Sequence, residues 1–520
     1  MAKSLCSSRG ISNRSISLGD DRDELDSKLD SDIFPISHPG KVEPSVKDNR
    51  DDMLSNLPDD IVLNIVERLD IADATRTSIL SRRWKQIPAM LSKIVIMVNS
   101  FEPCCDNWSI LDDIARARAN ATVHEATKHI LESRTASDSY TIHAMCLQFY
   151  LGEESTISIG QTVAKAMVTH KVGTVEFRLL TKVRARCTDA DLRAQGAQFM
   201  SFVDACPNTF GGLTRLNLER MRLGESEFPQ VFSICKQLKD LRLYCCDMGT
   251  LSLLELDHPQ LSKVEIATCD FEKVHLKWLP KLSVLSHEYW ISEHDPFSFG
   301  YVPLLQSVSI GNVGLSSFKT HRLSQLLSKA SSSIRELHLN FKCERIWVKP
   351  EGRKQLSMVF HGLRYVNLMN ISEECDLNWT MFILQGAPTL KELCVTVQDH
   401  FCEMIRGVSR KSMGFSDERK DKAVVDWEPS LGFKQNSLAV FRIFGFQAQD
   451  KFVSYIRNVM EAAVNLEKIY LHDKPVCRRC RRRVRRTSMY PKTWKHKSSI
   501  RDEINKGTNA PVGIHFSRNR

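Results

Sequence analysis

The residues of this chain best suited to chemistry lie near residue 480, where two cysteines occur close to two histidines. Cys477 and Cys480 have the C-x-x-C spacing of a zinc ligand pair, and His472 and His496 are the nearest further candidates. A structural zinc site needs four ligands in a tetrahedral arrangement. No second C-x-x-C pair is present, and the surrounding arginines would repel a dication. We therefore expect free thiols, with no metal or other cofactor.

A basic strip contains this cysteine pair. Ten lysines and arginines and no acid lie between residues 478 and 497, which equals the net charge of +10, so the rest of the chain is close to neutral. A nucleic-acid footprint over the whole surface is therefore not indicated. The strip can be a solvated tail, a nuclear-import signal or a contact for nucleic acid, but phosphate attraction alone gives only sequence-blind, salt-sensitive binding. We expect no nucleic-acid partner, and the import candidates are Arg478, Arg479, Arg481, Arg482, Arg483, Arg485 and Arg486.

The sequence lacks the motifs of several common enzyme classes. There is no G-x-S-x-G nucleophile elbow, no G-x-x-x-x-G-K-[ST] phosphate loop, no G-x-G-x-x-G and no H-E-x-x-H. Sixteen histidines and sixteen cysteines make stray pairs inevitable, so scattered pairs do not indicate a catalytic site. We expect a protein without catalytic residues.

Cysteine usage and hydropathy indicate the compartment. The cysteines are scattered and often lie inside apolar strand-like runs, as Cys146 and Cys394 do. This pattern is typical of buried free thiols in a reducing compartment. No run of about eighteen apolar residues predicts a membrane span, and the first residues lack the apolar core of a secretory signal. The expected location is the cytoplasm and the nucleus.

The elements that would position a binding surface begin at residue 54. Pro58 suits the first turn of a helix, and acidic residues follow it at the positive end of the helix dipole. Ile61, Ile65 and Leu69 then recur every four residues, with Val62 beside them. This spacing predicts a helix with a broad apolar face.

A second motif follows this helix at Leu80-Ser81-Arg82-Arg83-Trp84-Lys85. Ser81 can cap a further short helix that carries Trp84. Three short helices in fewer than forty residues cannot enclose much core by themselves. The segment is therefore either a docking module that a partner covers or an ordinary helical hairpin within a larger domain.

Beyond residue 145 the chain is repetitive. The pattern L-x-x-L-x-L begins at Leu213, Leu238 and Leu261, and the intervals between copies are mostly about 21 to 29 residues, the range of leucine-rich repeats. Alternate residues of such a strand point inward, so stacked strands form one apolar wall. An unrelated α/β sheet is the alternative, but a proline precedes several copies at one register. Further copies begin at Leu282, Leu305, Ile334, Leu363, Leu390 and Leu466, and weaker ones lie near Met145 and Val175.

These motifs resemble three units of the plant F-box/leucine-rich-repeat family. The Leu57-Pro58 run with the Leu80–Lys85 box looks like an F-box, and the strand–helix–strand pattern at 437–474 resembles the FBD unit that closes many such proteins. The fold class expected is α/β: a three-helix F-box, an irregular solenoid with a parallel sheet, and a strand–helix–strand cap. The expected divisions are a disordered leader (1–50) with an acidic stretch at 20–32, the F-box (51–95), a linker of helix and strand (96–144), the solenoid (145–400), a charged loop (401–436), the cap (437–474) and a disordered basic tail (475–520).

The resemblance implies a function. Family members use the F-box to bind the Skp adaptor, and through it a cullin, while their repeats recruit a protein target for ubiquitination. A non-degradative scaffold or transcription-associated adaptor remains the alternative. The residues implied to bind Skp are Leu54, Leu57, Pro58, Ile61, Val62, Ile65, Leu69, Leu80, Ser81 and Trp84.

Overall fold

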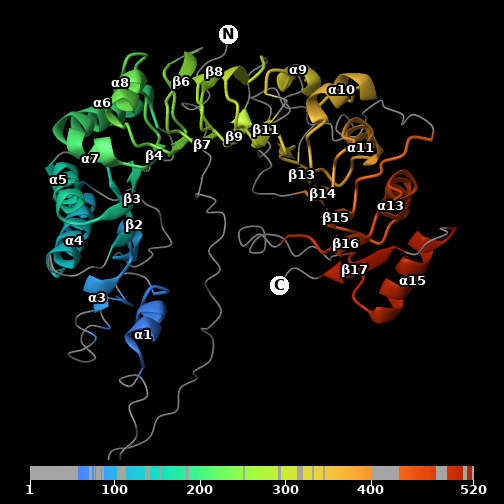
Figure 1. Cartoon of the computed structure of the whole chain (residues 1–520), viewed down its shortest axis with the longest axis horizontal. Coiled ribbons are helices and arrows are strands. Elements are labelled where there is room, and N and C mark those ends of the chain that lie inside the picture. The colour runs from blue at the N-terminus through green and yellow to red at the C-terminus, as the bar shows by residue number, and fades with distance from the viewer. Residues whose placement is uncertain are drawn as a thin grey trace, which may run out of the picture.

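The chain folds into an arc whose inner surface is a parallel β-sheet and whose outer surface is mostly helical (Figure 1). This is a computed structural model. It describes residues 57–517, apart from 70–72, 75–76, 78–83, 85–86, 102–112, 135–140, 153, 182–186, 250–251, 291–293, 313–319, 331–332, 344–345, 400–431, 476–488 and 508–511.

Fourteen strands form the inner sheet in the order in which they occur along the chain, and each neighbouring pair is parallel. This confirms the expected α/β solenoid. The strands are β1 (Lys93–Met97), β2 (Ile142–Tyr150), β3 (Val172–Leu180), β4 (Arg215–Glu219), β5 (Asp240–Tyr244), β7 (Lys263–Ala267), β9 (Val284–Trp290), β11 (Ser307–Asn312), β12 (Glu336–Asn340), β13 (Tyr365–Ile371), β14 (Glu392–Val397), β15 (Val440–Phe444), β16 (Lys468–His472) and β17 (Gly513–Ser517).

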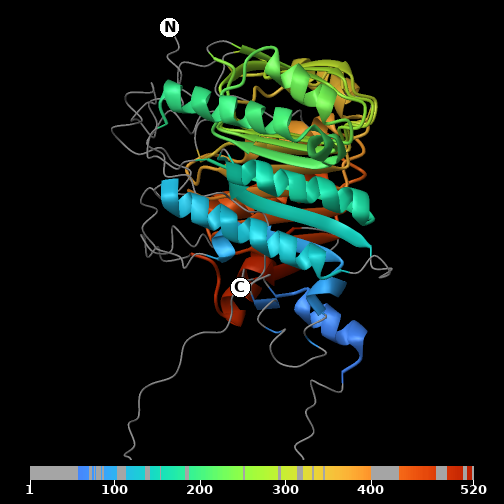
Figure 2. The same ribbon diagram turned by 90° about the vertical axis from the view of Figure 1, so that its left-hand side faces the viewer.

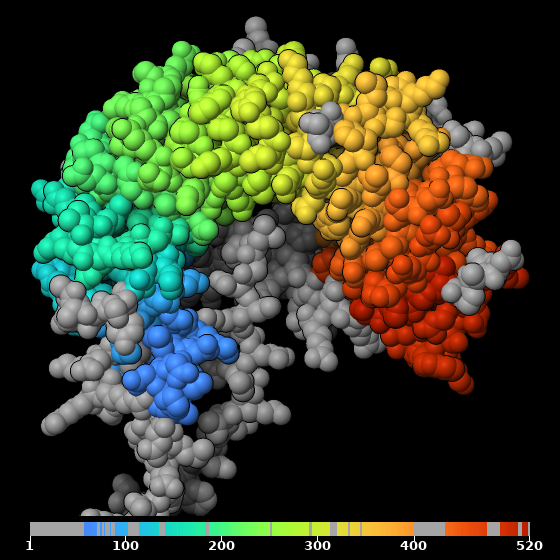
Figure 3. Space-filling model, viewed as in Figure 1, coloured from blue at the N-terminus to red at the C-terminus, as the bar shows by residue number. Residues whose placement is uncertain are grey.

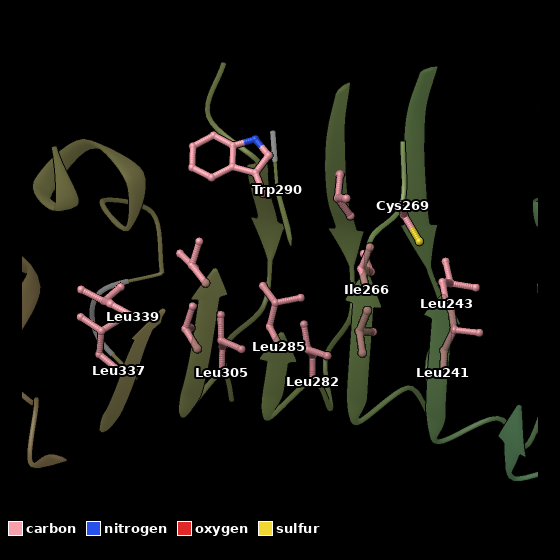
Figure 4. Close-up of a cluster of buried hydrophobic side chains, with 14 of the residues drawn as sticks. Leu241, Leu243, Ile266, Cys269, Leu282, Leu285, Trp290, Leu305, Leu337 and Leu339 are labelled. Atoms are coloured by element: carbon pink, nitrogen blue, oxygen red, sulfur yellow. The ribbon is translucent and has the colours of Figure 1, made fainter. Parts of the chain in front are cut away.

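The apolar residues of the repeat motif line up across these strands. Leu216 pairs in register with Leu241, which pairs with Val264, and all three are buried. Side chains of successive strands therefore point into one continuous core (Figure 4). The residues between these buried positions face the inner surface of the arc, because consecutive side chains of a strand point to opposite sides.

Helices cover the outside of both ends of the arc, and Figure 2 shows those of the first repeats side by side. At the N-terminal end they are α4 (Asp113–Glu132), α5 (Glu154–Thr169), α6 (Asp189–Ala205), α7 (Pro207–Gly212) and α8 (Glu227–Ile234). Towards the C-terminus they are α9 (Leu323–Leu326), α10 (Arg353–Phe360), the 3-10 turn η3 (Asn378–Thr380), α11 (Met381–Gly386), α13 (Asp450–Ala462) and α15 (Trp494–Asn505).

The middle of the outer layer is a second, three-stranded parallel sheet, which the sequence analysis missed. The repeats starting at Leu238, Leu261 and Leu282 are only 23, 21 and 23 residues long. An extended strand returns the chain with fewer residues than a helix does, because it rises about 3.3 Å per residue against 1.5 Å. The strands are β6 (Ser252–Asp257), β8 (Phe271–Trp278) and β10 (Phe297–Tyr301), with β8 in the centre.

Several inner strands end in a left-handed residue that is not glycine. Arg220, Cys245 and Thr268 have φ values of 50°, 51° and 56° and follow β4, β5 and β7. The N–H of each donates to a carbonyl of the next inner strand, at 2.8, 3.0 and 2.9 Å. Cys246, the residue after Cys245, is buried, and its thiol donates a hydrogen bond to the carbonyl of Leu218 at 3.6 Å. Thiols thus help to join consecutive repeats, which agrees with the expected buried free cysteines.

Two expected domain boundaries are wrong. The segment 96–144 is not a linker, because β1, α4 and β2 form a complete first repeat and β1 pairs with β2 from Lys93 to Met97. The solenoid therefore begins near residue 93 and not at 145. The apolar alternation in β1 is too short to reveal this pairing in the sequence.

The C-terminal boundary is also wrong. Residues 475–520 are not a wholly disordered tail, since α15 packs on α13 and β17 pairs with β16 from Lys468 to His472. The expected cap at 437–474 exists as β15, α13 and β16, but it is followed by one more repeat. Ile500, Ile504 and Ile514 are buried, and these few apolar residues fix the last repeat despite its basic surroundings. The leader (1–50), most of the charged loop (401–436) and the arginine strip lie outside the described residues.

Candidate protein-docking surfaces

Helix α1 (Asp59–Val66) presents an apolar row to the solvent. Ile61 is 45% exposed, and Ile65 and Leu69 are each 39% exposed. Val62 and Val66 lie on the opposite face and are buried. The predicted apolar stripe is therefore divided. One row packs against the protein, and the other is exposed within the described part of the chain. Large exposed apolar side chains at helical spacing form a typical groove-binding surface.

The helix is fixed to the solenoid by both apolar and polar contacts. Trp84 is buried in the same core as Val62. The carboxylate of Glu67 accepts hydrogen bonds from the backbone N–H and the hydroxyl of Ser92, at 3.0 and 2.5 Å. Ser92 directly precedes β1, so the module is joined to the first strand of the sheet. Figure 3 shows it at the N-terminal end of the arc.

The remaining residues expected at this surface have different positions. Pro58 is exposed, and its carbonyl accepts hydrogen bonds from the N–H groups of Ile61 and Val62 at 3.1 Å each. Leu57 packs partly buried against the core. Leu54, Leu80 and Ser81 lie outside the described residues.

The inner sheet carries paired charges in its N-terminal half. Arg215 of β4 lies between Glu176 of β3 and Asp240 of β5, with nitrogen–oxygen distances of 3.8 and 2.8 Å. One step further, Glu265 of β7 contacts Arg242 at 3.6 Å and Lys263 at 2.7 Å. These charges are paired within one strand or between neighbouring strands, so this half offers little unpaired charge to a partner.

A polar chain crosses the middle of the sheet. The carboxylate of Glu288 in β9 reaches Lys342 at 2.6 Å and accepts a hydrogen bond from the Asn340 amide at 3.2 Å. It spans β11 at Gly311, where a Cβ atom would lie 2.3 Å from the Glu288 carboxylate. A larger residue at this position would displace the Glu288 carboxylate from its present place. Lys342 is only 4% exposed, and its ammonium lies 4.1 Å from the ring centre of Tyr289.

Stacked rings occupy the inner sheet at its C-terminal end. We name Arg442, Phe444, Tyr470, His472 and His515 the aromatic row. The rings of Phe444 and His472 stack at 4.2 Å with a 10° angle, and those of Tyr470 and His515 stack at 5.0 Å. The Arg442 guanidinium lies 4.2 Å from the Tyr470 ring centre and donates to Glu392 at 2.6 Å. Flat, partly exposed rings with one cation offer stacking and apolar contacts to a partner.

His472 contributes to this row as a neutral ring. Burial lowers the pKa of His472, and the positive charge of Arg442 lowers it further. The imidazole is therefore uncharged at neutral pH, and it stacks on Phe444 as an aromatic group. From the sequence, His472 was expected only as a candidate metal ligand. The alternating pattern of β15 and β16 predicts their buried apolar residues, and the residues between these were the available indication of the aromatic row.

A carboxylate holds the C-terminal repeats together. Glu373, just after β13, accepts hydrogen bonds from the Lys474 ammonium at 2.6 Å, the Gln447 amide at 2.9 Å and the backbone N–H of Asp399 at 3.2 Å. Burial by itself would raise the pKa of Glu373, but these donors and the charge of Lys474 lower it overall. The contacts join the ends of β13 and β14 to residues after β15 and β16, and no local sequence pattern indicates them.

The sequence predicts neither a metal site nor a membrane span, and the structure describes only some of the residues concerned. Cys477 and Cys480 lie outside the described residues, whereas His472 belongs to the inner sheet and His496 is exposed on α15. Within the described part of the chain, no group of three or more His, Cys, Asp or Glu residues could hold a metal ion. In the same part, no helix has the length and apolar character needed to cross a lipid bilayer.

Two families match the sequence. The family described as At1g61320/AtMIF1, LRR domain, matches residues 190–510, which is more than half of the chain. The F-box domain family matches residues 54–94, which include α1 and Trp84. The two matches agree with the solenoid and with the helical module at its N-terminal end.

Curated relatives from Arabidopsis thaliana carry the same combination of units. The putative F-box/FBD/LRR-repeat protein At5g56810 is 29% identical over 41% of this chain and 47% of its own length. The F-box protein At5g03100 is 21% identical over 64% of this chain and 95% of its own length. The F-box/FBD/LRR-repeat protein At5g56420 is 24% identical over 41% of this chain and 49% of its own length. The chain thus spans about half the length of two of these three relatives.

Among solved structures, a chain of a TLR13–ssRNA13 complex covers 67% of this chain and 58% of its own length. Its identity is 12% and its TM-score is 0.27. This likeness is too low to support an argument about geometry or binding.

Proposed function

Because the chain belongs to the plant F-box proteins with leucine-rich repeats and an FBD-like unit, we propose that it is the substrate-recognition subunit of an SCF ubiquitin ligase. Its F-box binds an Skp adaptor and through it a cullin, and its solenoid binds a protein target. One observation carries this proposal: Ile61 and Ile65 are exposed on α1 while Val62 and Trp84 are buried behind them. The helix is thus folded and fixed, yet its outer row is largely exposed among the described residues.

The proposed role requires no catalytic residue in this chain. A receptor of this kind raises the effective concentration of a target lysine near a ubiquitin-charged enzyme. A fixed orientation makes this effect larger, and the Glu67–Ser92 hydrogen bonds fix α1 to β1. A target on the inner sheet is then held at a defined position relative to the adaptor.

The adaptor contact is tested with matched variants of one helix. Ile61→Ala with Ile65→Ala is expected to weaken Skp binding at least tenfold, or about 1.4 kcal/mol, because exposed anchors contribute to binding. The melting temperature should change little. Val62→Ala removes a buried neighbour and should lower the melting temperature instead. Normal Skp binding by a folded double variant would contradict this assignment, and recovery without any cullin would favour the non-degradative scaffold.

We propose that the target binds the aromatic row. The rings of Tyr470 and His515 are accessible, whereas the charges of the N-terminal half are paired within the sheet. Proximity labelling under proteasome inhibition, with and without the F-box helix, would identify the targets. Tyr470→Ala with His515→Ala should reduce their recovery about tenfold, and Arg242→Ala with Lys263→Ala should change it less than threefold. The opposite ranking would place the target on the N-terminal half.

We also propose that the protein occurs in both cytoplasm and nucleus and that the arginine strip directs import. Extended basic peptides bind the acidic grooves of import receptors. At 59.4 kDa the chain should enter the nucleus only slowly by diffusion. Changing Arg481, Arg482 and Arg483 to alanine should reduce the nuclear fraction of a fluorescently tagged chain. Unchanged localisation would show that the strip is not an import signal.

A further inference from the structure

One exposed surface near the C-terminal end combines a tryptophan with cationic side chains. We name Lys492, Trp494, Lys495 and His496 the α15 patch, and all four are exposed. Trp494 is 76% exposed, whereas Trp84 is only 4% exposed. Tryptophan is among the residues most enriched at the energetic centres of protein interfaces. Leaving its large apolar surface in water is unfavourable, so a partner that covers it gains binding energy.

The patch is rigid, although Trp494 does little to hold it. Ile500 and Ile504 of α15 are buried. On the other side of the patch, the hydroxyl of buried Tyr490 donates to the carbonyl of Leu471 at 3.0 Å. These anchors fix the segment between them. Trp494 is therefore available for binding and can be replaced without removing a core contact.

The positive charge of this segment is not balanced along the chain. Residues 489–501 contain Lys492, Lys495, Lys497 and Arg501 and no acid. The first acids that follow are Asp502 and Glu503, which lie about 10 Å or more from Lys495 along the helix. That separation is about one Debye length at physiological ionic strength, so screening weakens their influence. The patch thus favours an acidic partner with an apolar anchor.

We propose that the acidic segment 20–32 of this same chain docks on the α15 patch. The segment carries seven acidic and two basic residues, which gives a net charge of −5. No other stretch of thirteen residues in the chain holds as many acids. Leu25 and Leu29, spaced by four, supply apolar side chains for Trp494. Charge and apolar character are therefore complementary on the two sides.

The length of the chain allows this contact. Twenty-five residues separate Asp32 from Leu57, and in extended form they span about 80 Å. The fourteen strands of the inner sheet occupy about 62 Å along the arc at about 4.8 Å per step. The two ends of the arc face each other across its opening (Figure 1). The linker is therefore long enough for residues 20–32 to reach the α15 patch.

Cross-linking of the full chain tests the contact directly. A carbodiimide joins carboxylates to lysine amines only where they are in contact, and mass spectrometry locates the products. Links between residues 20–32 and Lys492 or Lys495 are expected at low salt and should fall at least fivefold at 0.5 M salt, because exposed charges are then screened. Arg353→Glu with Lys354→Glu, at exposed positions of α10, is the control and should leave these links unchanged. Links of the segment mainly to lysines elsewhere would overturn the proposal.

A peptide experiment tests the role of Trp494. In a full chain with Asp20, Asp21, Asp23 and Asp26 changed to Asn and Glu24 to Gln, the patch is left free. A fluorescent peptide of residues 18–34 should bind this chain at least tenfold more tightly than the unchanged chain, and Trp494→Ala should weaken that binding at least fivefold. Equal affinity for both chains, or full binding after Trp494→Ala, would overturn the proposal. Preferential binding of a DNA duplex at the patch would also overturn it and identify a nucleic-acid surface.

Discussion

The two halves of the inner sheet use their exposed positions differently. From β3 to β7 these positions hold charges that pair from strand to strand, such as Arg215 with Asp240. From β15 to β17 they hold flat rings, such as Tyr470 and His515. Both halves share the parallel backbone, and alternate strand positions are buried and apolar in each, as Leu216 and Ile469 are. The two halves therefore differ in the exposed residues between these buried positions and not in the repeat itself.

The difference also concerns how the halves are held together. Exposed ion pairs contribute little to stability, because water and salt screen them. The C-terminal half instead has the partly buried hydrogen bonds of Glu373 and an outer helix, α13, with Phe452 and Ile456 fully buried. We expect changes in the C-terminal half to be the more damaging.

The largest effect should follow truncation after residue 436. This removes β15, α13 and all later elements, so β14 loses its strand partner and the buried Thr380 loses its hydrogen bond to Tyr455. An uncapped solenoid exposes an apolar edge and aggregates. We expect a strongly reduced soluble yield, measured by size-exclusion chromatography.

The matched control is truncation after Gly507, which removes only β17 and a few flanking residues. Here the lost strand buries mainly Ile514 and leaves α13 and α15 in place. This chain should stay soluble with a lower melting temperature. A soluble chain ending at residue 436 with an unchanged melting curve would show that the C-terminal repeats form a separate domain.

Glu373→Ala should have the next largest effect. It leaves the Lys474 ammonium and the Gln447 amide without their acceptor, so we expect a loss of about 3 kcal/mol in the free energy of unfolding. Because the pKa of Glu373 is lowered in the folded state, its contribution is present above the unfolded pKa of about 4.3 and is lost as the pH falls below it. Urea unfolding of the parent and the variant at pH 7 and pH 3.5 measures the loss of unfolding free energy and its dependence on pH. A variant as stable as the parent at pH 7 would show that Glu373 does not stabilise the C-terminal repeats.

His287 gives a pH-dependent test where the two halves meet. It takes a leucine position of β9, and burial lowers its pKa to about 4. Between pH 6.5 and pH 4 the unfolded chain binds a proton that the folded chain does not, so stability falls by about 3 kcal/mol over this range. His287→Leu should remove this slope and raise the stability at pH 5. Parallel pH profiles for parent and variant would show that His287 does not titrate in this way.

The smallest effect is expected in the N-terminal half. Arg242→Ala removes an ion pair whose arginine side chain is 40% exposed, with Glu265 at 3.6 Å. Such pairs contribute about 1 kcal/mol or less, so the melting temperature should change by no more than a few degrees. A loss as large as that of Glu373→Ala would show that the two halves are held by similar means.

The sequence predicts the buried framework well. The leucines at 216, 241 and 285 are buried as their alternation required, and the helix near 449–464 is α13. These elements depend on local periodicity, which a single sequence displays. The row of Ile61, Ile65 and Leu69 was also predicted, although the periodicity alone did not show which side of α1 is covered.

Features that depend on distant residues were not predictable in the same way. The Glu373 contacts join residues up to 101 positions apart, and no local pattern marks them. The last repeat was missed because its basic composition resembles that of a disordered tail, yet it buries Tyr490 and three isoleucines and adds a strand to the sheet. The outer strands β6, β8 and β10 were missed because short repeats limit the space for a helix, which is a constraint from packing and not from propensity.

The left-handed residues at the ends of the inner strands lower the free energy of unfolding of the solenoid. Seven described residues other than glycine have positive φ, Thr268 and Tyr289 among them. Each costs about 1 kcal/mol relative to glycine, and the sum is comparable to the whole free energy of unfolding of an ordinary domain. This conformation therefore lowers the stability of the solenoid at the ends of its inner strands. Glycine at Thr268 would remove part of this cost without altering the buried apolar residues of the strands.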